Sequence, residues 1–379
     1  MNAAEKRRIT DRVKGIEERL LMIVNPMSRK GSELAARVRS LMRREGMDLE
    51  ETSTDHPDDT GSTVEFWSKR FGGSRVIMVF GGDGAINQVI NNIMLSRSNR
   101  KVVLAPMPAG TANDFCHAVG MDGPEGALEA LIDFNVKPVD LIRIETNDLD
   151  RNPRYCSNIV GVGLDGDLAR NALRYKRYGL VGYYYTAFKM AAASLFGGLK
   201  TYRFHIRTDS FEFQGSLVDV MCSNIGTYGR ILKIAPRAEP DDGKIHLTMV
   251  RPMSGPRSLL AGILLLKGKH TLVPEVETHA VTRVTIEALD DAFSQEDGEV
   301  VSCPAGTTLE LSVDRQALRV VTGPGPGGMA GREQGTEVKV QPRADDRSQD
   351  WLEDGAPAGP GQEEPAPPED GPPGGNPGQ

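Results

Sequence analysis

The sequence predicts an α/β domain followed by a second, mainly antiparallel β domain. In the first third of the chain, short apolar runs alternate with stretches of helical periodicity, as in a parallel sheet covered on both faces. From about Pro138, strands with a period of two dominate instead. We therefore place an N-terminal extension at residues 1–18, the α/β domain at 19–138 and the β domain at 139–322.

The α/β domain is predicted from its alternating elements. Strands are expected at residues 20–24, near 49–54, at 75–80 and at 101–105, and helices at 32–44, near 60–71, after 84 and from about 113. Ligands of such sheets bind at the carboxyl ends of the strands. The loops that follow the strands are therefore the first place to look for a site.

The β domain is predicted from seven period-two segments. They are residues 139–144, 155–162, 203–207, 216–223, 244–250, 281–286 and 308–313, with a helical stretch at 164–196. The longest apolar run of the chain, residues 259–266 (LLAGILLL), is far shorter than the ~20 residues that cross a bilayer. We interpret this run as a buried helix.

The charge of the chain is concentrated in its tail. Residues 323–379 hold 11 acidic and 4 basic side chains with 13 Gly and 11 Pro, which predicts disorder. The preceding residues hold 41 acids and 41 bases, which argues against a nucleic-acid binder that works by bulk charge. Four cysteines without paired spacing indicate neither a zinc site nor a disulfide scaffold and suit a reducing cytoplasm.

Three loops follow strands of the α/β domain. Residues 25–31 (NPMSRKG) open a helix, which favours a phosphate, although ordinary turn chemistry explains them equally well. Residues 81–87 (GGDGAIN) place one carboxylate among three glycines, so that a backbone can approach a ligand closely; the alternative is a plain turn with Asp83 as a helix cap. Residues 106–115 (PMPAGTANDF) place Thr111 and Asn113 to bond a nucleotide or to cap a helix.

Two acidic segments lie in the β domain. Residues 234–244 (IAPRAEPDDGK) suit a hard cation or a solvated turn. Residues 295–299 (QEDGE) suit a plain hairpin turn, or one carboxylate on a metal and another on a substrate hydroxyl.

Taken together, the five segments resemble the diacylglycerol kinase catalytic-domain family, especially its bacterial soluble lipid kinases, which are related to sphingosine and ceramide kinases. They occur in the family's order over roughly residues 19–322: NPMSRKG, GGDGA, PAGTANDF, SNIGTYGRILKIAPRAEPDDGKI and EDGEV. The resemblance implies a three-layer α/β nucleotide domain like those of NAD kinases and phosphofructokinases, and a C-terminal antiparallel β-sandwich domain that binds lipid. ATP is then expected in the cleft between the two domains.

The resemblance also assigns roles to residues. It implies ATP contacts from Asn25, Ser28, Thr54, Gly81, Gly82, Asp83, Gly84, Ala85, Ile86, Asn87, Gln88, Gly110, Thr111 and Asn113. Glu299 is similar to the proposed catalytic base, and Asp297 and Asp83 are expected to serve a metal and water network. A structural Mg²⁺ loop is implied at residues 239–244, with the side chain of Asp242 and the carbonyls of Glu239 and Lys244 as ligands.

Two positions depart from the family pattern. Ala85 stands where the family usually has Thr, which removes a hydroxyl from the phosphate loop. Arg230 and Ile231 follow Tyr228-Gly229 where the family reads Tyr-Gly-Gly-Gly. The second departure puts a cation and a β-branched residue near the cleft. It therefore concerns binding of the substrate more than binding of the nucleotide.

The activity that the resemblance implies is ATP-dependent phosphorylation of a membrane lipid hydroxyl, with Mg²⁺ bound. Diacylglycerol is the first candidate lipid, followed by ceramide, sphingoid bases and phosphatidylglycerol. The alternatives are an NAD kinase-like kinase of a small metabolite and a nucleotide-binding pseudokinase that acts as a regulator.

A kinase of this kind is expected in the cytoplasm at the inner face of the membrane. Its predicted partners are a lipid substrate and the bilayer surface, which the basic and aromatic residues of 168–200 would contact, or else these residues form an ordinary amphipathic helix pair. No nucleic-acid partner is expected, and a homodimer stays open.

Overall fold

The computed structural model describes residues 20–24, 28–44, 50–53, 64, 75–148, 153–173 and 199–324. Several predictions from the sequence fall outside these residues. They are the extension 1–18, the ATP contacts Asn25 and Thr54, most of the helix near 60–71, residues 174–198 of the docking stretch and nearly all of the tail.

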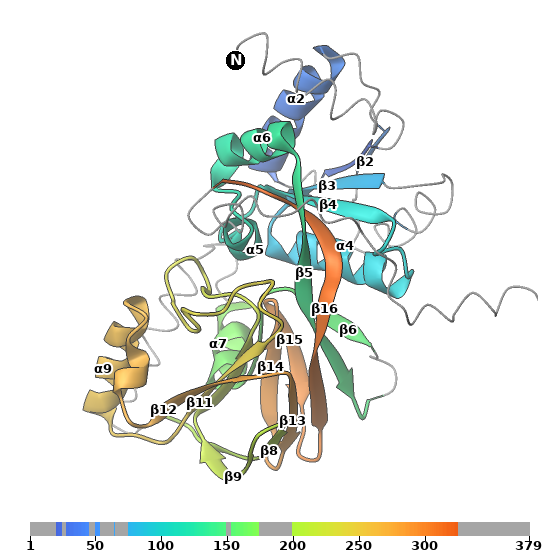
Figure 1. The fold of residues 1–379 in the computed structure, drawn as a ribbon. Coiled ribbons are helices and arrows are strands. Elements are labelled where there is room, and N and C mark those ends of the chain that lie inside the picture. Colours follow the sequence, from blue (N-terminus) through green and yellow to red (C-terminus); the bar gives the residue numbers. More distant parts are fainter. Residues whose placement is uncertain are drawn as a thin grey trace, which may run out of the picture. The chain divides into compact units, whose positions relative to one another are not determined.

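The N-terminal part is built on parallel strands in the order β2-β1-β3-β4, with helices on both faces (Figure 1). The strands are β1 (Leu20–Val24), β2 (Glu50–Ser53), β3 (Arg75–Gly81) and β4 (Val102–Pro108). α2 (Arg29–Arg44) and α6 (Gly123–Asp133) lie on one face, and α4 (Asp83–Leu95) and α5 (Asp114–Ala118) on the other. All residues of β1 and β4 are buried, which is why both read as continuous apolar runs.

Two long strands continue from this sheet into the second half of the chain. β5 (Asn135–Thr146) and β16 (Thr308–Thr322) pair antiparallel along most of their length, and β16 also pairs parallel with β4. Beyond β16, the order of paired strands in the sheet is β13 (Arg283–Ala288), β8 (Tyr202–Thr208) and β9 (Glu212–Leu217). β6 (Arg154–Cys156) pairs with β5. One mixed sheet therefore runs through both parts of the chain.

A second, antiparallel sheet has the order β12-β11-β10-β7-β14-β15. Its strands are β7 (Ile159–Gly163), β10 (Asp219–Ser223), β11 (Ile245–Val250), β12 (Val276–Val281), β14 (Ala292–Glu296) and β15 (Glu299–Cys303). Together with β13, β8 and β9 it encloses a second core, whose largest side chains include Tyr202 and Phe204. The helices of this half are α7 (Leu164–Ala172), α9 (Gly255–Leu266) and the short η3 (His270–Leu272).

The predicted fold class is confirmed, with corrections in detail. Three of the predicted strands are each split in two, because a turn or bend interrupts them: 155–162 into β6 and β7, 216–223 into β9 and β10, and 281–286 at Thr282, between β12 and β13. The predicted boundary at 138/139 is crossed by β5, and Ala317, Leu318, Val320 and Val321 of β16 pack in the first core.

The interpretation of residues 259–266 as a buried helix is wrong. The helix forms as α9, but Leu259, Leu260, Ile263 and Leu266 are exposed, and Gly255 is its one buried residue. Apolar composition predicted burial, yet α9 has a cavity on its inner side and nothing described on its outer side.

Candidate active site

The loop after β3 is held in a tight path by its glycines. Gly82 is the N-cap of α4, and the first helical hydrogen bond runs from the Ile86 N–H to the Gly82 carbonyl, 3.1 Å. A Cβ at Gly81 would stand 2.6 Å from the Cβ of Ala85, so this position needs glycine. At Gly84, by contrast, an added Cβ meets nothing within 4 Å, so the start of α4 is open to an approaching ligand.

The loop after β4 packs directly on the first. A side chain at Gly110 would overlap the Cα of Gly82, so the two backbones touch. Asn113 adopts a left-handed conformation (φ 56°), and its side chain closes the loop by accepting from the Gly110 N–H (2.7 Å) and donating to the Gly110 carbonyl (3.1 Å). Thr111, at the tip, is exposed.

Asp83 joins these two loops. Its carboxylate accepts from the Asn113 N–H (2.8 Å) and the Phe115 N–H (3.2 Å) at the start of α5. Burial raises the pKa of Asp83, the N–H of Phe115 lowers it and the nearby Asp297 raises it further. The single carboxylate among the glycines therefore fixes the position of the third motif, whatever else it contacts.

Ser28 has its hydroxyl engaged within the protein. The Oγ caps α2 by accepting from the Gly31 N–H (3.1 Å) and donates to the Ala109 carbonyl (2.8 Å). The first motif is thereby tied to the third. An ATP contact from Ser28 stays a prediction.

Asp297 and Gly298 form a tight hairpin turn between β14 and β15. Both have positive φ, 48° and 87°, as a type I′ turn requires, and Glu296 pairs directly with Glu299. The Asp297 carboxylate accepts from the Ser157 N–H (2.7 Å) and hydroxyl (2.8 Å), from the Asn158 and Ile159 N–H groups (both 2.9 Å) and from the Cys156 thiol (2.7 Å). It therefore anchors the hairpin to the β6–β7 connection.

Helix α4 reaches the same connection. The Asn91 side chain donates to the Tyr155 carbonyl (2.8 Å) and accepts from the Tyr155 N–H (2.8 Å). With its amide oriented to donate, Asn87 bonds the Asp297 carboxylate at 3.1 Å. The glycine-rich loop and the acidic hairpin therefore lie at two ends of one short chain of contacts.

Glu299 lies at the first position of β15, and its side chain is exposed. Its cross-strand neighbour Glu296 is buried and bound to the Arg154 guanidinium at 2.7 Å. Arg154 thus engages Glu296, whereas Glu299 faces solvent at the edge of the site.

The predicted magnesium loop is held by protein donors. The Asp242 carboxylate accepts from the N–H groups of Lys244 (2.9 Å) and Glu239 (3.3 Å) and lies 2.8 Å from His246 Nε2. The Glu239 carbonyl accepts from the Asp242 N–H at 3.2 Å. Among the described residues there is no group of three or more His, Cys, Asp or Glu side chains suited to a metal. These bonds fold the loop around the Asp242 carboxylate, and the structural Mg²⁺ site implied by the resemblance stays a prediction.

Asp114 is a functional candidate that the motif analysis passed over. It is buried at the start of α5, and its carboxylate accepts from the N–H groups of Gly229 (2.7 Å) and Arg230 (2.8 Å). Burial and the neighbouring Asp83 raise its pKa to about 6. The carboxylate thereby connects the third motif to the loop that departs from the family pattern, and its place directly after Asn113 was the available signal.

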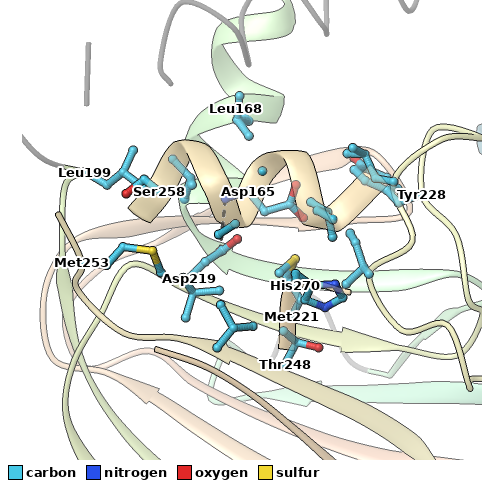
Figure 2. Close-up of a pocket in the computed structure, with 18 residues that line it drawn as sticks. Asp165, Leu168, Leu199, Asp219, Met221, Tyr228, Thr248, Met253, Ser258 and His270 are labelled. Atoms are coloured by element: carbon cyan, nitrogen blue, oxygen red, sulfur yellow. Dashed lines mark hydrogen bonds between the residues drawn. The ribbon is translucent and has the colours of Figure 1, made fainter. Parts of the chain in front are cut away.

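A cavity of about 200 Å³ lies between α9, α7 and the antiparallel sheet (Figure 2). Its walls are mainly apolar, with Asp165, Asp219, His270 and Tyr228 as ionisable groups. Burial raises the pKa of Asp219 well above its usual range, and Asp165 adds to the rise; burial lowers the pKa of His270. Both shifts favour uncharged side chains, which suits an apolar ligand.

One buried side chain connects this cavity to the acidic hairpin. Gln295 donates to the Asp165 carboxylate (2.7 Å) and accepts from the Gly298 N–H (2.8 Å). The cavity and the turn that carries Glu299 are thus separated by a single residue. The sequence offered no signal for this link, because Asp165 and Gln295 are 130 positions apart.

Both halves of the chain match domains of known protein families. Residues 19–144 match the diacylglycerol kinase catalytic domain, and residues 158–322 match the YegS C-terminal NAD kinase beta sandwich-like domain. A probable YegS-like lipid kinase of Shewanella frigidimarina is 30% identical over 47% of this chain and 55% of its own length. A diacylglycerol kinase of Mycobacterium tuberculosis is 26% identical over 79% of this chain and 93% of its own length.

The solved structure of a diacylglycerol kinase-like protein from Bacillus anthracis has the same fold. Its TM-score is 0.63 at 20% identity, with 81% of this chain and 98% of that chain covered. The chain thus combines an α/β domain that matches a diacylglycerol kinase catalytic domain with a C-terminal β-sandwich-like domain, the domain pair of lipid kinases. Within residues 19–322, the chain is therefore similar to YegS-like lipid kinases and to diacylglycerol kinases.

Proposed function

We propose that the protein transfers the γ-phosphoryl group of ATP to the hydroxyl of a membrane lipid, with diacylglycerol as the leading candidate. The observation that carries this proposal is the chain of contacts from the glycine-rich loops, through Asn87 and Asp297, to a hairpin beside an apolar cavity. A site for a small soluble metabolite has no need of that cavity.

The nucleotide side of the proposal rests on the start of α4. The N–H groups of the first helical turn have no partner within the helix, and they carry the positive end of the helix dipole. Gly84 leaves this end open. The triphosphate of ATP fits there, and its Mg²⁺ enters as part of the co-substrate.

The lipid side rests on the cavity and Glu299. An acyl chain in the apolar cavity would bring the headgroup hydroxyl to the Gln295 end, next to the turn. Glu299 is the exposed carboxylate there and is proposed to accept the hydroxyl proton as its oxygen attacks the γ-phosphorus and the bond to ADP breaks. The buried Asp165 and Asp219 face the lipid from the cavity wall.

The test is a phosphorylation assay with radiolabelled ATP over diacylglycerol, ceramide, a sphingoid base, phosphatidylglycerol and NAD. Diacylglycerol is expected to be labelled most. In Glu299→Gln the turnover should fall by about 10²–10⁴-fold, while ATP binding and the melting temperature stay unchanged.

Labelling of NAD alone would contradict the lipid substrate. Binding of ATP without transfer to any of these acceptors would identify the chain as a pseudokinase. A Glu299→Gln variant with full turnover would remove this residue from the base role.

A further inference from the structure

Helix α9 carries two apolar faces. Ser258, Ala261, Gly262 and Leu265 on one face line the cavity. Leu259, Leu260, Ile263 and Leu266 lie on the other face and are 45–50% exposed. A surface helix normally has polar residues on its outer face, so a second apolar face needs a partner.

The exposed face continues onto neighbouring segments. Leu272 of η3 is 71% exposed and Ile231 is 44% exposed. The Lys233 N–H donates to the Leu265 carbonyl (3.2 Å), so the loop with Ile231 lies beside the end of α9. We define the α9 surface as the apolar side chains Leu259, Leu260, Ile263, Leu266, Leu272 and Ile231.

Positive charge surrounds the α9 surface. Residues 251–274 contain two arginines and two lysines and no Asp or Glu, although Arg251 and Arg257 pair with Glu277 and Glu275 just beyond this segment. Residues 229–238 contain two arginines and one lysine and no acid. Lys267, Lys269, Lys233 and Arg230 are exposed. This concentration is local, because acids and bases balance over the first 322 residues.

We propose that the α9 surface docks the protein on an anionic lipid bilayer, with α9 lying in the plane of the interface. Apolar side chains flanked by cations match the acyl region and the anionic headgroups. The 12 residues of α9 extend only about 18 Å, well short of the hydrocarbon core, which suits a helix that lies on the membrane.

A bilayer fits better than a second copy of the chain. In a two-fold dimer the same patch would be buried on both copies, so the exposed Lys267, Lys269 and Arg230 of both copies would add like charges to one interface. In addition, the inner face of α9 lines the cavity, so docking places a lipid-sized space directly behind the helix that contacts the membrane.

The departure at Arg230-Ile231 has a role in this arrangement. The two residues add one cation and one apolar side chain to the edge of the α9 surface. The backbone N–H groups of Gly229 and Arg230 are held by Asp114, next to the nucleotide loops. The docking surface is therefore anchored to the proposed catalytic site by a buried carboxylate.

This inference rests on the proposed lipid kinase function but is tested apart from it. The full chain without ATP is floated with phosphatidylcholine vesicles, with and without phosphatidylglycerol. We expect binding to the vesicles with phosphatidylglycerol, which weakens at high salt. Leu260→Glu should weaken this binding about tenfold or more, because it places a charge in the apolar face.

The matched control is Leu95→Glu at the end of α4. Leu95 is 52% exposed against 49% for Leu260, so the same change is made at equal exposure away from α9. This control should bind vesicles as the wild type does. Arg230→Gly with Ile231→Gly, which restores the family pattern, should weaken binding about threefold or more.

Equal vesicle binding by the wild type and Leu260→Glu would overturn the proposal, as would a wild type that binds neither vesicle. Sedimentation velocity gives a further check: a dimer that Leu260→Glu dissociates would assign the surface to a second copy instead. Failure of the kinase proposal is separate. It would show as no phosphorylation of a short-chain, water-soluble diacylglycerol by a protein that still binds vesicles.

Discussion

Two carboxylates two positions apart serve different purposes in the acidic hairpin. Asp297 accepts hydrogen bonds from Cys156, Ser157, Asn158 and Ile159, whereas Glu299 is exposed. Asp297→Asn replaces one acceptor oxygen by a donor that faces other donors. We expect it to lower the free energy of unfolding by about 2–4 kcal/mol, as measured by chemical denaturation.

Glu299→Gln is the internal control for this prediction. It makes the same change from carboxylate to amide at an exposed residue, so it should leave the denaturation midpoint unchanged. A stable Asp297→Asn variant that has lost its activity would show that Asp297 acts on the substrate rather than on the turn.

Asp114 predicts a dependence of stability on pH. Its pKa of about 6 lies above the ordinary 3.8, so the folded chain holds this proton more tightly than the unfolded chain does. The stabilisation is complete below the unfolded pKa and is lost as the pH rises through the folded pKa. Wild type should therefore lose up to about 3 kcal/mol of unfolding free energy, relative to Asp114→Asn, between pH 4 and 7.

Asp83 and His117 both act on the pKa of Asp114, and both remain in the variant, so the difference between the two curves isolates Asp114. Parallel curves over this pH range would show that its pKa is not raised in the protein.

At the scale of elements, glycine-to-alanine substitutions in α4 and in the third motif should have opposite effects on the stability of the protein. Gly84→Ala adds a methyl group to open space in a helix, so it should stabilise the protein by about 0.4–1 kcal/mol. The same methyl group blocks the proposed phosphate site. ATP affinity, measured by calorimetry, should fall about tenfold, which is about 1.4 kcal/mol.

Gly110→Ala is the contrasting variant, because its methyl group would overlap Gly82 and push the two loops apart. It should lose both stability and ATP binding. If Gly84→Ala bound ATP normally, the nucleotide would not approach this end of α4.

The strands and helices near the nucleotide loops could be predicted because their patterns are local. Buried strands such as β1 and β4 read as continuous apolar runs, and each is followed by a helix with a marked start. α9 was placed correctly as a helix but wrongly as buried, because composition does not reveal what lies against each face. Residues 295–299 form the plain hairpin turn that was one of their two interpretations. A turn at Asp297-Gly298 is compatible with the proposed role of Glu299 as the base.

At the scale of the whole molecule, the sequence could identify the motifs but not the contacts between them. Asp83 and Asn113 lie in neighbouring loops of one sheet edge, so their approach was predictable. The links from Asp114 to Arg230 and from Asp165 to Gln295 span more than 100 positions and depend on how β5 and β16 join the two cores.

The described helices include none that is long and apolar enough to span a membrane.

The connection between cavity and catalytic hairpin yields the last prediction. Ala261 on the inner face of α9 lines the cavity, and Ala261→Phe would fill part of its roughly 200 Å³ without touching the nucleotide loops. The kcat/KM for long-chain diacylglycerol should fall about tenfold or more, which is about 1.4 kcal/mol, because the ring would occupy space that the acyl chain needs, while the KM for ATP stays the same.

Leu264→Phe is the matched control, since it makes a similar change on the same helix at a residue that does not line the cavity. It should keep the wild-type kcat/KM. If Ala261→Phe also kept it, the acyl chain would lie outside the cavity, and Gln295 would connect the hairpin to a space that the substrate does not enter. A loss confined to long-chain substrates would instead place the lipid tail behind α9, with its hydroxyl at the end where Glu299 stands.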